Sequence, residues 1–188
     1  MPIDTSVLQN KLNLTSKRDI DDAEVELLFE LYRHVFKQPL KNLAFQNILR
    51  WHQQWLGNLY DWAGELRSVN LSKNGFQFAA AAQLPRLSKQ FELDFLKSFA
   101  QLPAMPRDQL VRFLAESHVE LVLIHPFRDG NGRLSRLLLD VMAVAAGGAP
   151  LDYSVWVENK EFYFKAIQAG AGGDYTHIER LIHDVIEL

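Results

Sequence analysis

The residues best suited to chemistry stand together between His125 and Arg136, in the run His-Pro-Phe-Arg-Asp-Gly-Asn-Gly-Arg-Leu-Ser-Arg. The imidazole of His125 can accept a proton near neutral pH, and the carboxylate of Asp129 is an oxygen ligand of the kind that Mg²⁺ prefers. Arg133 and Arg136 are three positions apart, so they would share one face of a helix. This set could hold the phosphates of a nucleotide on a hard cation and deprotonate an attacking hydroxyl group.

Two helices must position this run. Apolar residues recur at helical spacing before it, as far as Ile124, and again after it, from Leu134 onward. Pro126 cannot continue the first helix, so the chain is expected to turn through the glycines and enter a second helix at about Asn131. A helix N-terminus presents unpaired amide groups and a positive dipole end, which suit an anion.

The spacing of residues in the run argues against three other kinds of structure. Asp-Gly and Asn-Gly pairs are typical of hairpin turns, but the helical period on both sides argues against a hairpin. An EF-hand loop that began at Asp129 would need glycine at position 134 and glutamate at position 140, where leucine and aspartate stand. A dinucleotide fingerprint fails because a helix precedes the glycines and Ser135 replaces the third glycine. A plain corner between two helices remains open on spacing alone.

The run meets every fixed position of H-P-F-x-[D/E]-G-N-G-R-x-x-R, and so resembles the signature of the Fic (filamentation induced by cAMP) family. The segments Tyr60–Arg67 and Ser72–Phe78 are similar to that family's Y-x-W-A-G-x-x-R and flap segments, so the likeness covers most of residues 42–145. The resemblance implies an all-α, Fic-type helical core with a small β-hairpin flap next to the active site. It also implies a protein adenylyltransferase that moves AMP from ATP to a hydroxyl side chain of a target protein.

The resemblance assigns roles residue by residue. His125 would be the general base and Asp129 the Mg²⁺ ligand, although Asp129 could instead cap the following helix. Phe127 would be an apolar anchor of the loop. Five further residues of the signature would bind the phosphates of ATP, through backbone amides or guanidinium groups: Gly130, Asn131, Gly132, Arg133 and Arg136. His118, two turns before His125, is expected to have a packing or supporting role.

A short hairpin is predicted over residues 69–78, because apolar and polar residues alternate on either side of the turn pair Asn74-Gly75. A hairpin packed only by its phenylalanines would explain the pattern equally well. In the family the matching segment is a flap, and a target segment pairs with its backbone edge. The flap residues would be Lys73, Asn74, Gly75, Phe76, Gln77 and Phe78.

Two further functions remain alternatives to adenylylation. The Doc branch of the family carries lysine where this chain has Gly132, and it transfers the γ-phosphate, so the glycine favours AMP transfer. A non-catalytic Fic-fold binding module is disfavoured by the intact His125, Asp129 and arginines.

Regulation is also implied by the resemblance. Many Fic enzymes are inhibited by a helix with [S/T]-x-x-x-E-[G/N], whose glutamate pairs with the second signature arginine, here Arg136. Ser154–Asn159 matches this short pattern but follows the signature too soon, and the match is interpreted as coincidental. The inhibitory glutamate is therefore expected from a separate small antitoxin protein, with this chain as the toxin. The resemblance names type II topoisomerase subunits as candidate targets.

Composition narrows the class of protein. A length of 188 residues with 48% apolar residues suits one domain, expected at residues 21–188 after a polar lead-in at 1–20. A net charge of −3 gives no electrostatic reason to expect nucleic acid. The absence of cysteine excludes disulfides and thiolate zinc sites. With no secretory signal visible at Met1–Asp4 and no long apolar run, a cytoplasmic protein without a membrane span is expected.

The other expected helices cover about residues 21–36, 42–56, 84–99, 106–124, 159–169 and 174 onward.

Overall fold

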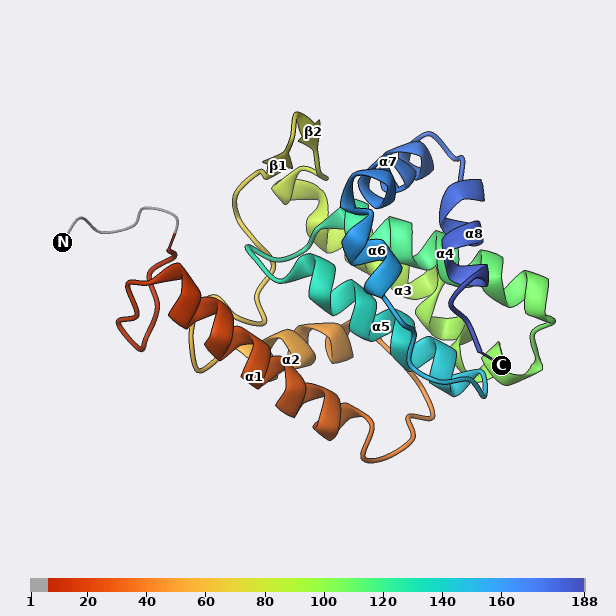
Figure 1. Cartoon of the computed structure of the whole chain (residues 1–188), viewed down its shortest axis with the longest axis horizontal. Helices are drawn as coiled ribbons and strands as arrows, with labels where there is room; N and C mark the ends of the chain where they lie inside the picture. Colours follow the sequence, from red (N-terminus) through yellow and green to blue (C-terminus); the bar gives the residue numbers. More distant parts are fainter. Residues whose placement is uncertain (1–6, 188) are drawn as a thin grey trace. The chain divides into compact units, whose positions relative to one another are not determined.

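The computed structural model describes residues 7–187, and Met1–Ser6 and Leu188 lie outside the described part. Within it the fold is all-α with one two-stranded hairpin, as the sequence predicted (Figure 1). The helices are α1 (Lys17–Val35), α2 (Phe45–Leu56), α3 (Leu84–Asp94), α4 (Arg107–Ile124), α5 (Asn131–Ala145), α6 (Ser154–Glu158), α7 (Lys160–Ala171) and α8 (Thr176–His183). Two 3₁₀ segments, η1 (Ala81–Gln83) and η2 (Leu96–Ala104), flank α3, and the hairpin consists of β1 (Ser72–Lys73) and β2 (Phe76–Gln77).

The chain forms two compact units. The first comprises the described part of Met1–Pro39 together with Gln46–Glu65, and the second comprises Leu40–Phe45 with Leu66 onward. In the first unit, the Glu24 carboxylate is only 2% exposed and accepts a hydrogen bond from the Tyr60 hydroxyl at 2.9 Å. The indole of Trp55 donates to the carbonyl of Glu24 at 2.8 Å, so the buried polar groups of this unit are paired.

Helix α1 begins earlier than predicted. Asp21 and Asp22 offer a cap for a helix that starts at about residue 21, but the N-cap is Ser16, whose hydroxyl accepts from the amide of Asp19. Serine followed by an acidic residue in the first turn is a sound N-terminal signal, and the flanking polar residues concealed it. The predicted lead-in of residues 1–20 therefore includes helical residues, while its first six lie outside the described part.

The second unit is built around α4. Leu114, Ala115 and Val119 of this helix are fully buried, and α5, α7 and α8 pack against it. Gly170 brings α7 close, because a Cβ atom there would lie 2.5 Å from Cγ1 of Val119. The end of α4 and the start of α5, which flank the signature, are thus held by a close-packed core.

The hairpin agrees with its predicted turn. Ser72 pairs with Gln77 and Lys73 with Phe76 in antiparallel register. Asn74 and Gly75 have φ values of 51° and 80°, as a type I′ turn requires. The amide of Phe78 donates to the carbonyl of Leu71, which extends the pairing toward the base of the hairpin. Figure 1 shows the hairpin beside α7, which it contacts through Phe76 and Phe164.

Several boundaries differ from the prediction. The single helix expected over residues 84–99 ends at Asp94 and continues as η2, with the ring of Phe95 packed on Phe91 and Phe113. The segment Ser154–Glu158, over which no helix was expected, forms the short helix α6. The sequence Thr176-x-x-Glu179 resembles a capping box, but no side chain caps α8 in this way, and the carboxylate of Asp174 accepts from the Thr176 amide.

Helix α2 begins at Phe45 rather than at about residue 42. The amide of Phe45 donates to Oε2 of Glu92, at 2.7 Å. Glu92 lies far along the sequence, so no local pattern could have located this helix start.

Candidate active site

His125 is the C-cap residue of α4 and adopts a left-handed conformation, with φ 50° and ψ 60°. The proline that follows disfavours the right-handed helical region for this residue. Nδ1 of His125 lies 3.0 Å from the carbonyl oxygen of Val122. Because a carbonyl only accepts, this hydrogen bond assigns the proton of the neutral ring to Nδ1 and leaves a lone pair on Nε2.

The phenyl ring of Phe78 stacks on the imidazole of His125, with ring centres 3.7 Å apart and planes 12° apart. Burial, with smaller contributions from the charges of Arg67 and Lys73, lowers the pKa of His125 from 6.5 to about 4. The Val122 carbonyl and the Asp129 carboxylate act in the opposite direction. The imidazole is therefore neutral at pH 7, and flap and signature residues lie close enough to affect it.

The turn after His125 is fastened by Asn131. Its side-chain oxygen accepts from the amide of Phe127, and its side-chain nitrogen donates to the carbonyl of Phe127, both at 2.8 Å. The Phe127 side chain is fully buried, as an anchor of the loop would be. Because the Asn131 side chain is occupied in this way, it can offer an anion only its backbone amide.

Gly130 is the N-cap of α5 and has a φ of 79°, a conformation that glycine adopts without strain. Its amide donates to Oδ1 of Asp129 at 2.6 Å, so in this structure that amide is engaged within the loop. The alternative of Asp129 as the helix N-cap is wrong, since Gly130 holds that position. Asn131 and Gly132 open the helix, where first-turn amides have no partner within the helix.

Asp129 is exposed, and among residues 7–187 no three His, Asp or Glu side chains cluster in a way that would hold a metal. A single exposed carboxylate nevertheless suits Mg²⁺, which takes one or two carboxylates and completes its coordination with phosphate oxygens and water. The donor set therefore fits Mg²⁺ carried in with a nucleotide.

The two arginines differ in environment. Arg133 is half-buried on the first turn of α5. The guanidinium carbon of Arg136 lies 5.3 Å from the ring centre of Tyr153 and 5.7 Å from that of Tyr163. His118, expected to have a packing or supporting role, is 2% exposed, and its Nε2 lies 2.8 Å from the Tyr163 hydroxyl.

The role of Arg67 was missed by sequence reasoning, although the residue ends the Tyr60–Arg67 segment. Its side chain is 5% exposed and donates to the carbonyls of His125 (2.7 Å), Val69 (2.6 Å), Ala79 (2.5 Å) and Ile124 (3.3 Å). One guanidinium group thereby joins both ends of the hairpin segment to the turn that carries His125. The amide of Arg67 also donates to the carbonyl of Pro126 at 2.9 Å.

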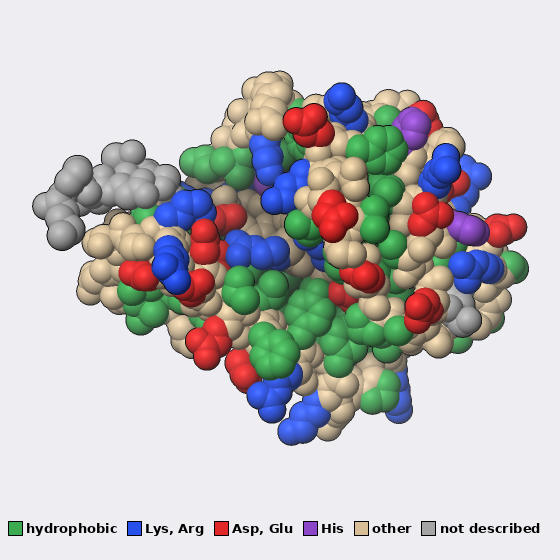
Figure 2. Space-filling model, in the orientation of Figure 1, with side chains coloured by type: hydrophobic (Ala, Val, Ile, Leu, Met, Phe, Trp, Pro, Cys, Tyr) green, Lys and Arg blue, Asp and Glu red, His purple; other side chains and the backbone are tan. Residues whose placement is uncertain are grey.

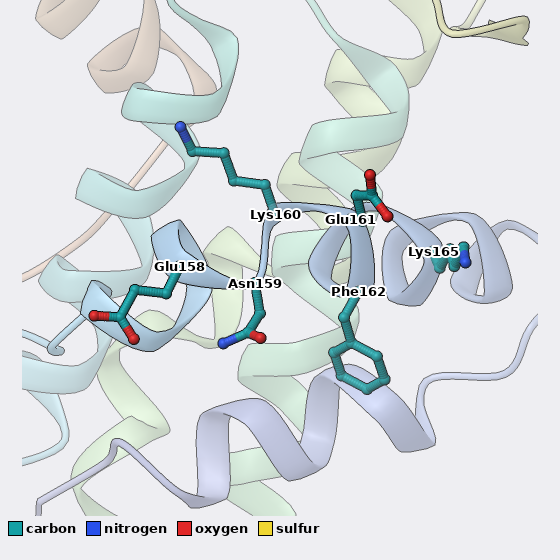
Figure 3. A pocket seen from close by; sticks show the side chains of 6 residues that line it. All are labelled: Glu158, Asn159, Lys160, Glu161, Phe162 and Lys165. Atoms are coloured by element: carbon teal, nitrogen blue, oxygen red, sulfur yellow. The ribbon is translucent and has the colours of Figure 1, made fainter.

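The pocket at the junction of α6 and α7 is separate from these residues. It has a volume of about 510 Å³ and is lined by Glu158, Asn159, Lys160, Glu161, Phe162 and Lys165 (Figure 3). None of the predicted catalytic or phosphate-binding residues lines it. Glu158, the glutamate of the short inhibitory-motif match, is exposed at the end of α6.

The surface agrees with the small net charge. On the face shown in Figure 2, basic and acidic side chains are interspersed over the surface. Within residues 7–187, no helix combines the length and the apolar character needed to cross a membrane.

The helical core places a neutral histidine and two arginines around a glycine-rich helix N-terminus, and such an arrangement could hold an anion. The sequence profile of the Fic/DOC family matches residues 42–143. The chain is 26% identical over 180 residues to the probable protein adenylyltransferase Fic of Escherichia coli K12, a match covering 96% of this chain and 88% of that protein. It is 30% identical over 181 residues to the probable protein adenylyltransferase y4lH of Sinorhizobium fredii, over 89% of this chain and 85% of that one. The chain belongs to the Fic/DOC family.

Solved structures share the fold. The N-terminal Fic domain of a Bartonella effector protein from Bartonella sp. AR 15-3 aligns with a TM-score of 0.84 at 20% identity, covering 100% of this chain and 90% of that one. BepC from Bartonella tribocorum, crystallised with bound AMPPNP, aligns with a TM-score of 0.80 at 19% identity, covering 100% of this chain and 95% of that one.

Proposed function

We propose that this chain is a protein adenylyltransferase that transfers AMP from ATP to a Ser, Thr or Tyr hydroxyl of a target protein. The observation that carries the proposal is the neutral imidazole of His125, with its lone pair on Nε2, beside the glycine-rich start of α5. The named activities of the relatives in E. coli and S. fredii support the same reaction.

The residues of this chain would act mainly by positioning. Nε2 of His125 accepts the proton of the target hydroxyl while the oxygen of that hydroxyl bonds to the α-phosphorus of ATP. The bond between the α-phosphorus and the bridging oxygen breaks, and pyrophosphate leaves with that oxygen. The first amides of α5, together with Arg133 and Arg136, hold the phosphates and oppose the charge that develops on them.

Asp129 would hold Mg²⁺ together with phosphate oxygens of ATP. The ion, when bound, neutralises phosphate charge. The hydrogen bond from Gly130 fixes one carboxylate oxygen of Asp129.

The hairpin would dock the target. In the part of the chain that the structure describes, two strands pair with each other alone, so their outer edges offer backbone groups to an added strand. Phe76 fixes the hairpin against Phe164 of α7, and Phe78 fixes it against His125. A segment bound along this edge would bring its hydroxyl toward Nε2 of His125.

Control would come from outside the chain, through a small antitoxin protein that supplies a glutamate to Arg136, in a cytoplasmic toxin–antitoxin pair. Among residues 7–187, Arg136 forms no ion pair with a carboxylate, and Glu158 is exposed on α6. We therefore expect Glu158→Gly to leave adenylylation by the isolated chain unchanged, with Glu161→Gly on α7 as its control. A large gain for Glu158→Gly alone would show that the chain inhibits itself.

The test of the reaction uses ATP labelled at either the α- or the γ-phosphate, added to a cell lysate with the purified chain. Transfer of the α-label, lost in His125→Ala and retained in the exposed control His34→Ala, is the expected result. Transfer of the γ-label would establish Doc-like phosphorylation instead, and transfer of neither label would favour a binding module. Purified type II topoisomerase subunits should be tested in the same assay. If no label is transferred to them, they are excluded as targets.

A further inference from the structure

Arg136 lies against a cluster of aromatic rings contributed by the segment after α5. Its guanidinium carbon is within 6 Å of the centres of two rings, at 5.3 Å from Tyr153 and 5.7 Å from Tyr163. A guanidinium at such a distance over a ring face is attracted by the electrons of the ring. We call Tyr153, Trp156 and Tyr163 the aromatic cradle of Arg136.

Each ring of the cradle makes a hydrogen bond or a ring contact with its neighbours. The Tyr153 hydroxyl lies 2.8 Å from Oδ1 of Asp140 and 3.1 Å from the carbonyl oxygen of Arg136 itself, and can donate to either. The Tyr163 hydroxyl lies 2.8 Å from Nε2 of His118. Trp156, only 1% exposed, stacks on Tyr163 with ring centres 5.3 Å apart and meets Tyr153 edge-on at 5.0 Å. The cradle is therefore a fixed surface rather than a set of mobile side chains.

The charge of Arg136 is not neutralised by its surroundings. Asp140, one helical turn further along α5, accepts from the amide of Leu151 and from Tyr153. In the described part of the chain, Arg136 forms no ion pair with a carboxylate, and its buried Nε has no hydrogen-bond partner. Burial, followed by the charge of Arg136, lowers the pKa of His118 to about 3, and burial raises the pKa of Tyr163 to about 12. Both groups are uncharged at pH 7.

We propose that Tyr153 and Tyr163 are positioning residues that preorganise the uncompensated guanidinium of Arg136 for the outer phosphates of ATP, in place of an acidic partner. The inference rests on the proposed function for its ligand. A carboxylate would fix the arginine equally well, but it would also reduce its attraction for phosphate. Aromatic rings orient the guanidinium and leave its positive charge intact, so the cradle affects only the part of the nucleotide that Arg136 contacts.

The test compares two nucleotides that differ in their outer phosphates. Binding of AMPPNP and of AMP, each with Mg²⁺, would be measured by calorimetry for the wild type and for Tyr153→Leu and Tyr163→Leu. Loss of either ring should weaken AMPPNP binding by about 3- to 30-fold and change AMP binding by less than about 2-fold. Phe162→Leu, which removes an exposed ring from the same helix as Tyr163, should alter neither.

A second series separates the ring electrons from simple packing. Phenylalanine and its fluorinated analogues at position 163 keep the shape of the ring while weakening its attraction for a cation. AMPPNP affinity should fall stepwise with the number of fluorine atoms, at an unchanged unfolding temperature.

Equal loss of AMP and AMPPNP binding on ring removal, or no dependence on fluorination, would overturn the inference. The labelling assay decides the proposed reaction separately. A wild type that prefers AMPPNP through the cradle but transfers no label would retain the positioning role and lose the adenylyltransferase function.

Discussion

At the scale of single residues, His125 combines a fixed tautomer with a lowered pKa. A base with a pKa of about 4 remains neutral, and so able to accept a proton, well below pH 6. We expect the acid limb of the kcat/KM–pH profile, which reports the pKa of the free protein, to lie near pH 4–5 rather than at the ordinary histidine value. Lys73→Met removes one charge that lowers this pKa, so it should move the limb upward, whereas Lys160→Met on α7 should not. An acid limb at pH 6.5 in the wild type would contradict the assignment.

Substitution of Gly132 by alanine should affect the folding stability and the ATP affinity in opposite directions. A Cβ atom at this position would meet nothing within 4 Å, so Gly132→Ala should fold normally and stabilise α5 by up to about 1 kcal/mol. If phosphates approach the backbone here, the added methyl group should weaken ATP binding by about 10-fold or more. Thermal unfolding and nucleotide titration of the same sample give both quantities. Unchanged ATP affinity would place the phosphates elsewhere.

Features of the candidate site were predictable only where they depend on local sequence. His125, Asp129 and the arginines are candidates by residue type and spacing, and Pro126 accounts for the departure of His125 from right-handed helical angles. The engagement of the Gly130 amide by Asp129, by contrast, depends on the detailed path of the loop. The contacts of Arg136 with Tyr153 and Tyr163 join α5 to segments whose packing no short pattern encodes.

At the scale of elements, Arg67 couples the hairpin segment to the end of α4. Replacing it by methionine would leave four backbone carbonyls without their donor, and we expect a loss of about 2–4 kcal/mol in the free energy of unfolding. Because the imidazole of His125 and the hairpin would both shift, we expect kcat to fall by a larger factor than the KM for ATP rises. Arg67→Lys should recover only part of both properties, since lysine cannot reach all four acceptors in one geometry.

The matched control for Arg67 is Arg128→Met, which removes an exposed arginine from a variable position of the signature. It should change neither unfolding nor kcat appreciably. Equal losses for the two substitutions would show that charge, rather than the hydrogen bonds of Arg67, matters at this site.

Elements with strong periodicity were predicted well, and elements defined by tertiary contacts were not. The hairpin turn at Asn74-Gly75 and the helices on either side of the signature follow from their patterns. The start of α2 depends on Glu92, and the end of α3 on the packing of Phe95, both of which involve residues distant in sequence. The short helix α6 escaped prediction because five residues contain too little of a helical period.

At the scale of the whole molecule, the neutral histidines His118, which is buried, and His125, which is half-buried, link stability to pH. Both pKa values are lowered from 6.5, to about 3 for His118 and about 4 for His125. The unfolded chain therefore binds protons that the folded chain does not, and stability is lost as pH falls from 6.5 toward these values. Between pH 6.5 and 4.5 we expect a loss on the order of 3–5 kcal/mol in the free energy of unfolding, measured by denaturant titration.

His118→Gln should flatten this dependence, while substitution of the exposed His34 should leave it unchanged. A stability profile that is flat over this range in the wild type would mean that the histidines are hydrated in solution.

The stacking of Phe78 on His125 makes the imidazole ring a reporter of the position of the hairpin. Protons held over the face of a benzene ring experience its ring current, and at a ring separation of 3.7 Å the imidazole resonances should be displaced upfield. Any event that lifts the hairpin, such as the docking of a target peptide, would return those signals toward the positions of an ordinary histidine. A single resolved NMR line could therefore follow movement of the hairpin in the resting enzyme, without a label and before any phosphorus chemistry takes place.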